Sequence, residues 1–145
     1  MESPAQQILI EELVVEFPEI RQIEDRHLRV HDEILPHPFM REVRALVESA
    51  YRAAQPTERD LDLSRRIMKE IDGALSSFDP DVDNLVGVSF LEIPVPEESW
   101  WREMCADMGP HLRRMLAEKH PAPPATRWTR LLQWFGWGEE SNQPG

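Results

Sequence analysis

The fold is indicated most clearly by the segment Asp79-Pro-Asp-Val-Asp-Asn-Leu-Val-Gly-Val-Ser-Phe-Leu-Glu-Ile93. Asp79 can accept hydrogen bonds from the free amides of a first helical turn, and Pro80 fits that turn because no N–H is needed there. Asp81 and Asp83 complement the positive end of the helix. The apolar residues that follow recur at helical spacing and spread around most of the circumference. The segment therefore predicts one central helix that is buried on several sides.

Helical periodicity also predicts elements on both sides of this segment, with prolines or glycines near their ends. These predicted helices cover residues 4–17, 19–32, 39–54, 58–78, 97–108, 112–119 and 126–134. The sequence shows no alternating pattern typical of a β-strand. We therefore expect an all-α fold, either a single compact bundle or a short solenoid-like array of six to eight helices.

A chain of 145 residues is the size of one domain. We expect a helical domain over residues 1–120, a Pro-rich connector with a Trp-rich helix packed on the domain over 121–138, and a disordered tail over 139–145. Cys105 is the only cysteine, so an intramolecular disulfide is excluded. The N-terminus lacks a secretory leader, and no apolar run approaches the roughly 20 residues of a membrane span. These features favour a cytoplasmic protein.

The net charge of −11 is concentrated in two blocks of the sequence. Residues 1–36 carry a net −6 and residues 79–109 a net −7, whereas 37–78 are neutral and 110–145 carry +2. Such acidic blocks repel nucleic-acid phosphates and attract basic proteins. An acidic surface also keeps a protein soluble, and this simpler interpretation stays open.

Three sequence elements resemble a known family: Ile34-Leu-Pro-His37, the helix that begins Phe39-Met40, and Val82-x-Asn-Leu-Val-x-Val-Ser-Phe-Leu-Glu92. The chain resembles, over roughly residues 8–118, a family of small bacterial proteins classed as a domain of unknown function. The resemblance implies a bacterial source and a compact helical domain. It supplies no catalytic residues.

One histidine pair has the spacing of a metal site. His27 and His31 lie one helical turn apart, and both could reach an ion at about 2.1 Å, with Asp32 and Glu33 alongside. The glutamate of the H-E-x-x-H motif is missing, so a solvated or capping pair is the simpler interpretation. His37, which stands between two prolines, fits a loop or the start of a helix.

Other catalytic patterns are incomplete. Ser89 lacks the second glycine of a nucleophile elbow and follows a helical pattern, so we expect it to pack within a helix. Cys105 is predicted to be a buried apolar thiol. Asp79, Asp81 and Asp83 imitate the start of a calcium loop, but the required glycine and glutamate are absent, so helix capping explains them better.

The segment 127–137 is unusually rich in tryptophan and arginine. It could close the core, bind a partner or lie on a membrane surface. We expect it to pack on the core, in which case Trp134→Ala would cost about 3–5 kcal/mol and truncation before Pro121 would leave an unstable domain.

Without catalytic machinery, the sequence favours a non-enzymatic protein-binding domain that needs no cofactor and no metal. An immunity-type neutraliser of a basic toxin or nuclease would suit the acidic blocks, with no binding to nucleic acid. The candidate partner-binding residues are Asp79, Asp81, Asp83, Glu92, Trp128, Trp134 and Trp137. One alternative is a metal-dependent helical hydrolase that uses His27 and His31. The other is a peripheral membrane adaptor that acts through the Trp-rich helix, although membrane binding is the less favoured use of that helix.

Overall fold

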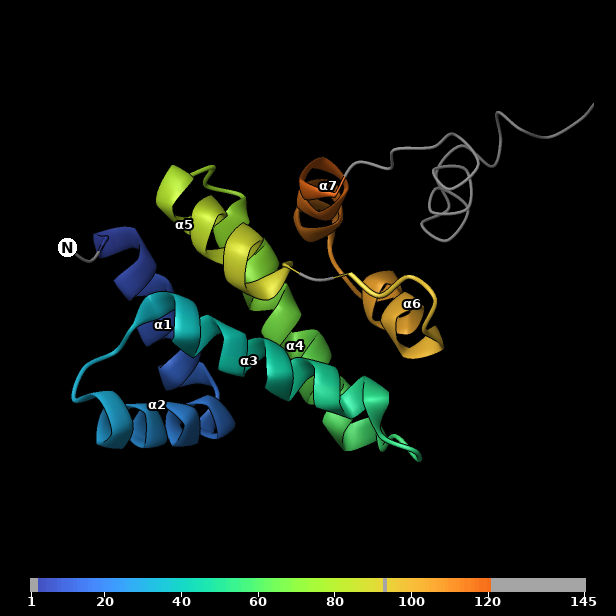
Figure 1. The fold of residues 1–145 in the computed structure, drawn as a ribbon, viewed down its shortest axis with the longest axis horizontal. Coiled ribbons are helices and arrows are strands. Elements are labelled where there is room, and N and C mark those ends of the chain that lie inside the picture. Colours follow the sequence, from blue (N-terminus) through green and yellow to red (C-terminus); the bar gives the residue numbers. More distant parts are fainter. Residues whose placement is uncertain (1–2, 93, 121–145) are drawn as a thin grey trace, which may run out of the picture.

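A computed structural model of the chain describes residues 3–92 and 94–120, which form seven α-helices and one π-helical segment, η1 (Figure 1). In chain order these are α1 (Pro4–Glu16), α2 (Pro18–His31), α3 (Pro36–Arg52), α4 (Glu58–Leu75), α5 (Pro80–Leu85), η1 (Val86–Phe90), α6 (Ser99–Ala106) and α7 (Pro110–Lys119). No strand occurs among the described residues. The prediction of an all-α fold is confirmed.

Capping side chains begin three of these helices as the sequence predicts. The Ser3 hydroxyl accepts from the Gln6 amide at α1, and the Thr57 hydroxyl accepts from the Asp60 amide at 3.2 Å at α4. Asp79 does the same for α5. Each cap satisfies an amide that has no partner inside its own helix.

The start of α3 differs from the prediction. The sequence places it at Phe39, whereas the helix begins at Pro36. Pro36 and Pro38 both lie in the first turn, where backbone amides have no intrahelical acceptor and a proline therefore loses no hydrogen bond.

The predicted central helix is buried, but it changes its winding halfway. After α5 the chain continues as η1, in which the Leu91 amide donates to the Val86 carbonyl at 3.0 Å. Arg44 of α3 donates to the Phe90 carbonyl at 2.9 Å. The predicted central helix therefore forms as α5 followed directly by η1, and the Phe90 carbonyl at its end accepts from a side chain of another helix.

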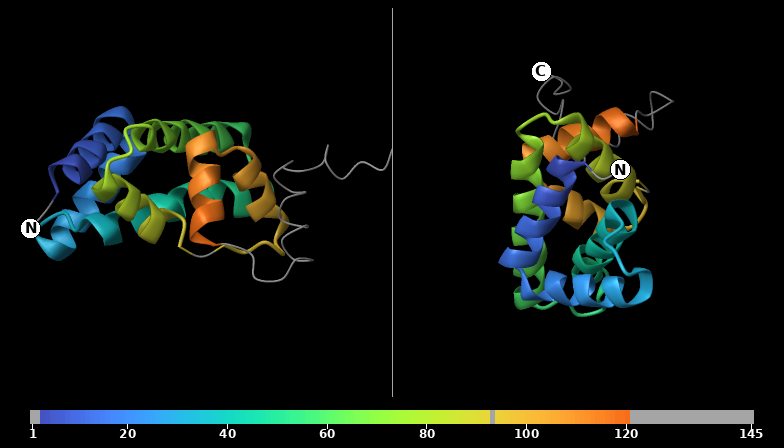
Figure 2. Two further views of the ribbon diagram at one scale, coloured as in Figure 1. Left: turned by 90° about the horizontal axis from the view of Figure 1, so that it is seen from above. Right: turned by 90° about the vertical axis from the view of Figure 1, so that its left-hand side faces the viewer.

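The two longest helices, α3 and α4, run beside each other along the molecule (Figure 1). Figure 2 shows α1 and α2 at the end near the N-terminus, and α6 and α7 at the other end. Helix α3 also contacts α1, α2, α5, η1 and α6. It is the element around which the others pack.

One connected apolar core draws side chains from every helix. Its largest fully buried members are Trp101, Phe17, Phe39 and Phe90. Within the described ranges, no helix is long and apolar enough to cross a bilayer. The predicted connector, the Trp-rich helix with Trp128, Trp134 and Trp137, and the predicted tail lie outside the described residues, so those expectations stay predictions.

We expect the Cys105 thiol to be unreactive in the folded protein. Cys105 is 3% exposed. Burial raises the pKa of its thiol to about 12, although the charges of Arg44 and Arg113 act to lower it. Because the thiolate is the nucleophile, an aromatic disulfide reagent at pH 8 should label the native chain far more slowly than the chain in guanidinium chloride. Complete labelling of the native chain within minutes would contradict this.

Candidate functional site

The acidic residues at the start of α5 have structural roles of their own. Asp79 accepts from the amides of Asp81 at 2.8 Å and Val82 at 3.3 Å. The Asp81 carboxylate accepts from the Ser3 hydroxyl at 2.8 Å, and the Asp81 carbonyl accepts from the Gln6 side chain at 2.7 Å. The interpretation of Asp79 as a helix cap is confirmed, and these bonds also fasten the start of α5 to the start of α1.

A shallow groove of about 220 Å³ lies between α1, the end of α4 and the start of α5. The residues that line it are mostly apolar or small. They include Ile8, which is 55% exposed. Glu12 and Asp79 are the charged residues of the lining, and no basic side chain of the described chain contributes to it. We call this feature the acidic groove.

Helix α1, which lines one side of the acidic groove, carries further carboxylates. Glu11 and Glu16 are exposed, and α1 contains no basic residue. None of the α1 carboxylates forms an ion pair within the described residues. By contrast, several acids of α3 and α4 are paired with arginine, such as Asp62 with Arg66 at 3.1 Å. The acidic groove therefore has an uncompensated negative charge.

The fold brings together two acidic blocks that are far apart in the sequence. Glu12 belongs to the block 1–36 and Asp79 to the block 79–109. Asp83 lies half-buried in the first turn of α5. Glu92 is not part of the acidic groove: it follows η1 and forms an ion pair of 3.6 Å with Arg41.

Sequence reasoning missed Ile8 and Glu12 as site residues. One signal could have found Ile8. Ile8, Leu9 and Ile10 are consecutive apolar residues, and a helix with one buried face cannot place all three in the core. Leu9 and Ile10 are buried, whereas Ile8 faces the acidic groove.

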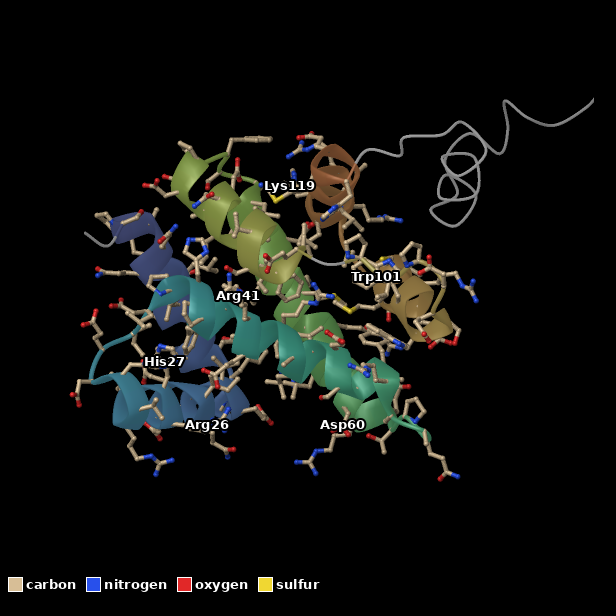
Figure 3. The ribbon with its side chains drawn as sticks, viewed as in Figure 1. Arg26, His27, Arg41, Asp60, Trp101 and Lys119 are labelled. Atoms are coloured by element: carbon tan, nitrogen blue, oxygen red, sulfur yellow. The ribbon has the colours of Figure 1, made fainter. Side chains whose placement is uncertain are left out.

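His27 is buried between α2 and α3 (Figure 3) and uses both ring nitrogens. Its Nε2 accepts from the Leu35 amide at 3.0 Å, which places the proton of the neutral ring on Nδ1, and this N–H donates to Glu42 at 3.0 Å. Of the solvated or capping pair that the sequence suggests, the solvated form does not apply to His27, which is buried and accepts from the backbone amide of Leu35 at the start of α3. A metal ion at His27 would have to displace one of these bonds.

His31 lies on the same face of α2 as His27, as the spacing predicts, with ring centroids 4.5 Å apart. His31 itself is exposed. No group of three or more His, Cys, Asp or Glu side chains in the described chain is arranged to hold a metal ion. The geometry thus favours a structural role for His27.

Ser89 connects two of the motifs that carried the family resemblance. Its hydroxyl lies 2.6 Å from Nδ1 of His37, and its residue is 2% exposed. The expectation that Ser89 packs within a helical segment is confirmed. The bond to His37, 52 residues away in sequence, was not predicted.

These helices around one core, with an acidic groove at their α1–α5 edge, define a small all-α domain. The chain belongs to the family described as "Domain of unknown function (DUF7674)", whose model matches residues 10–120. No curated protein and no solved structure matches the chain. The predicted resemblance to a family of this kind is confirmed, and its description names no activity.

Proposed function

We propose that this chain is a non-enzymatic protein-binding domain that docks a basic protein on the acidic groove. The observation that carries the proposal is the placement of Glu12 and Asp79 beside the exposed Ile8. Interfaces commonly combine an apolar centre with a polar rim, and charged rims steer partners of opposite charge. The acidic groove offers both features.

The size of the acidic groove supports a protein partner over a small molecule. Pockets for drug-sized ligands hold about 300–1,000 Å³. The acidic groove, at about 220 Å³, suits one aliphatic side chain from the surface of a partner. Basic residues around that side chain would meet Glu12, Asp79 and the other α1 carboxylates.

A neutraliser of a basic toxin or nuclease is the specific form of this proposal. Its support is electrostatic. The net charge of −11 and the unpaired carboxylates of α1 would attract the cationic site of an enzyme that acts on nucleic acid. The setting we propose is a bacterial cytoplasm, and the single buried thiol of Cys105 fits a reducing compartment.

The alternatives have less support. A hydrolase that uses His27 and His31 would have to break the bonds of His27 to Leu35 or Glu42. A membrane adaptor would depend on Trp128, Trp134 and Trp137, which lie outside the described residues.

Capture from an extract of the native host tests the proposal. We expect the immobilised chain to retain a basic protein at low ionic strength and to release it as the salt concentration rises, because screening weakens the attraction between exposed charges. Ile8→Asp should retain less of the same protein, since it removes the apolar contact while adding to the acidity. Retention of no basic protein by the wild-type chain, or undiminished retention by Ile8→Asp, would contradict the proposal.

A further inference from the structure

A second and larger cavity lies along α3, away from the acidic groove. It holds about 450 Å³ and is bounded by α3, η1 and the segment that leads into α6. Its walls include three arginines of α3, the hydroxyl-bearing Ser89 and the apolar side chains of Val95 and Trp100. We call it the α3 pocket; its volume is within the range of small-molecule sites.

Two of its arginines lie against aromatic rings and share one carboxylate. Arg44 lies 5.2 Å from the ring centroid of Trp101, and Arg52 lies 5.3 Å from that of Trp100. Both guanidinium groups contact Glu48, at 3.3 and 3.1 Å. Glu48 is therefore shared by two cations. The lining as a whole holds three arginines and three glutamates, so it has no formal net charge. What distinguishes its charged groups is how firmly each one is held.

Arg41 is the arginine that is held most loosely. Its side chain is 51% exposed, and its ion pair with Glu92 measures 3.6 Å, which is longer than a hydrogen bond. Exposed pairs of this kind contribute only about 0–1 kcal/mol. The Arg41 guanidinium, labelled in Figure 3, can therefore exchange Glu92 for another anion at little cost.

The other walls complement an organic body. Val95 and Trp100 offer apolar surface, and Ala45 leaves room beside them. Ser89 forms part of the wall, but it is buried and its hydroxyl already bonds His37. Glu98 is the lining carboxylate that has no arginine partner within the described residues, and it is exposed, so solvent and salt screen its charge.

We propose that the α3 pocket binds a small organic anion, whose carboxylate or phosphate group pairs with Arg41 and whose apolar body lies against Val95 and Trp100. A planar guanidinium holds such groups through two parallel hydrogen bonds. This site is separate from the acidic groove and does not depend on the protein-binding proposal.

NMR titration of the ¹⁵N-labelled full chain tests the α3 pocket. The probes are benzoate, phenyl phosphate, inorganic phosphate and the neutral benzyl alcohol. We expect benzoate or phenyl phosphate to shift the amide signals of residues that line the pocket, with a Kd below about 1 mM. The stronger of the two identifies the preferred anionic group. Benzyl alcohol and inorganic phosphate should each bind at least about tenfold more weakly, because each lacks one half of the recognised chemistry.

The matched variants are Arg41→Gln and Arg29→Gln. Arg29 is exposed on α2, so its replacement changes the net charge equally without touching the pocket. Arg41→Gln should weaken binding at least about tenfold, and Arg29→Gln should leave it within about twofold. No shifts at about 10 mM of either aromatic anion, equal losses in the two variants, or inorganic phosphate binding as tightly as phenyl phosphate would each overturn the proposal.

Discussion

Replacing Trp101 by alanine is expected to lower the free energy of unfolding by about 3–5 kcal/mol, the range for removing a large buried aromatic side chain. Trp101 is 1% exposed and belongs to the connected core. Its ring also lies against the Arg44 guanidinium, which in turn donates to the Phe90 carbonyl. The substitution therefore leaves a cavity and loosens the arginine that contacts the end of η1.

Urea denaturation followed by far-ultraviolet circular dichroism measures this loss. Trp100→Ala is the comparison variant, because Trp100 is only partly buried. Its ring contacts the exposed Arg52 and, edge to face, the ring of Trp101 at 6.1 Å between centroids. Its loss of the cation–π contact should be worth about 0.5–1 kcal/mol. A Trp101→Ala protein within 1 kcal/mol of the wild type, or a larger loss in Trp100→Ala, would contradict the position of Trp101 in the core.

The second large effect concerns His27. His27→Ala should cost about 2–4 kcal/mol, because it leaves a cavity and deprives the Leu35 amide of its acceptor and Glu42 of its donor. The same denaturation experiment measures it. Wild-type stability in His27→Ala would contradict this structural role. Zinc binding by the wild type that His27→Ala abolishes would favour the metal-site alternative.

Glu42 gives this cluster a defined pH dependence. Partial burial alone would raise the Glu42 pKa, but the hydrogen bonds from His27 and Arg26, together with the positive charge of Arg26, lower it below 4.5. The lowered pKa means that the stabilisation from Glu42 is present above about pH 4.5 and is lost as the pH falls further. Between pH 7 and 4, Glu42→Gln should therefore lose less stability than the wild type, whereas the exposed Glu33→Gln should follow the wild type. Parallel curves for Glu42→Gln and the wild type would contradict this.

Local chemistry explains why much of the fold could be predicted. Caps such as Ser3, Thr57 and Asp79 act within three residues, so the sequence alone locates the starts of α1, α4 and α5. The π-helical winding of η1 could not be found in this way. Two contacts around η1 come from distant parts of the chain: Arg44 donates to the Phe90 carbonyl, 46 residues away, and the end of the Lys119 side chain lies against Gly87.

For the candidate sites, the sequence predicted residue types and their spacing but not which side chains come into contact. Spacing placed His27 and His31 on one face of a helix, which is right, but Leu35 and Glu42 take the nitrogens of His27 only in the folded chain. Block charges likewise identified where acidity is concentrated along the sequence. Tertiary packing decides which carboxylates lie close together. It places Asp79 and Glu12 in the lining of one groove and Glu92 beside Arg41.

Docking of a basic protein on the acidic groove can be tested by the association rate of the captured partner with two charge-reversal variants. Glu12→Lys changes the rim, whereas Glu103→Lys makes the same change on α6 at the other end of the molecule. Rim charges act mainly on association. By stopped-flow fluorescence at low salt, Glu12→Lys should associate on the order of tenfold more slowly than wild type, and Glu103→Lys within about twofold of it. Equal rates for the two variants would contradict the account.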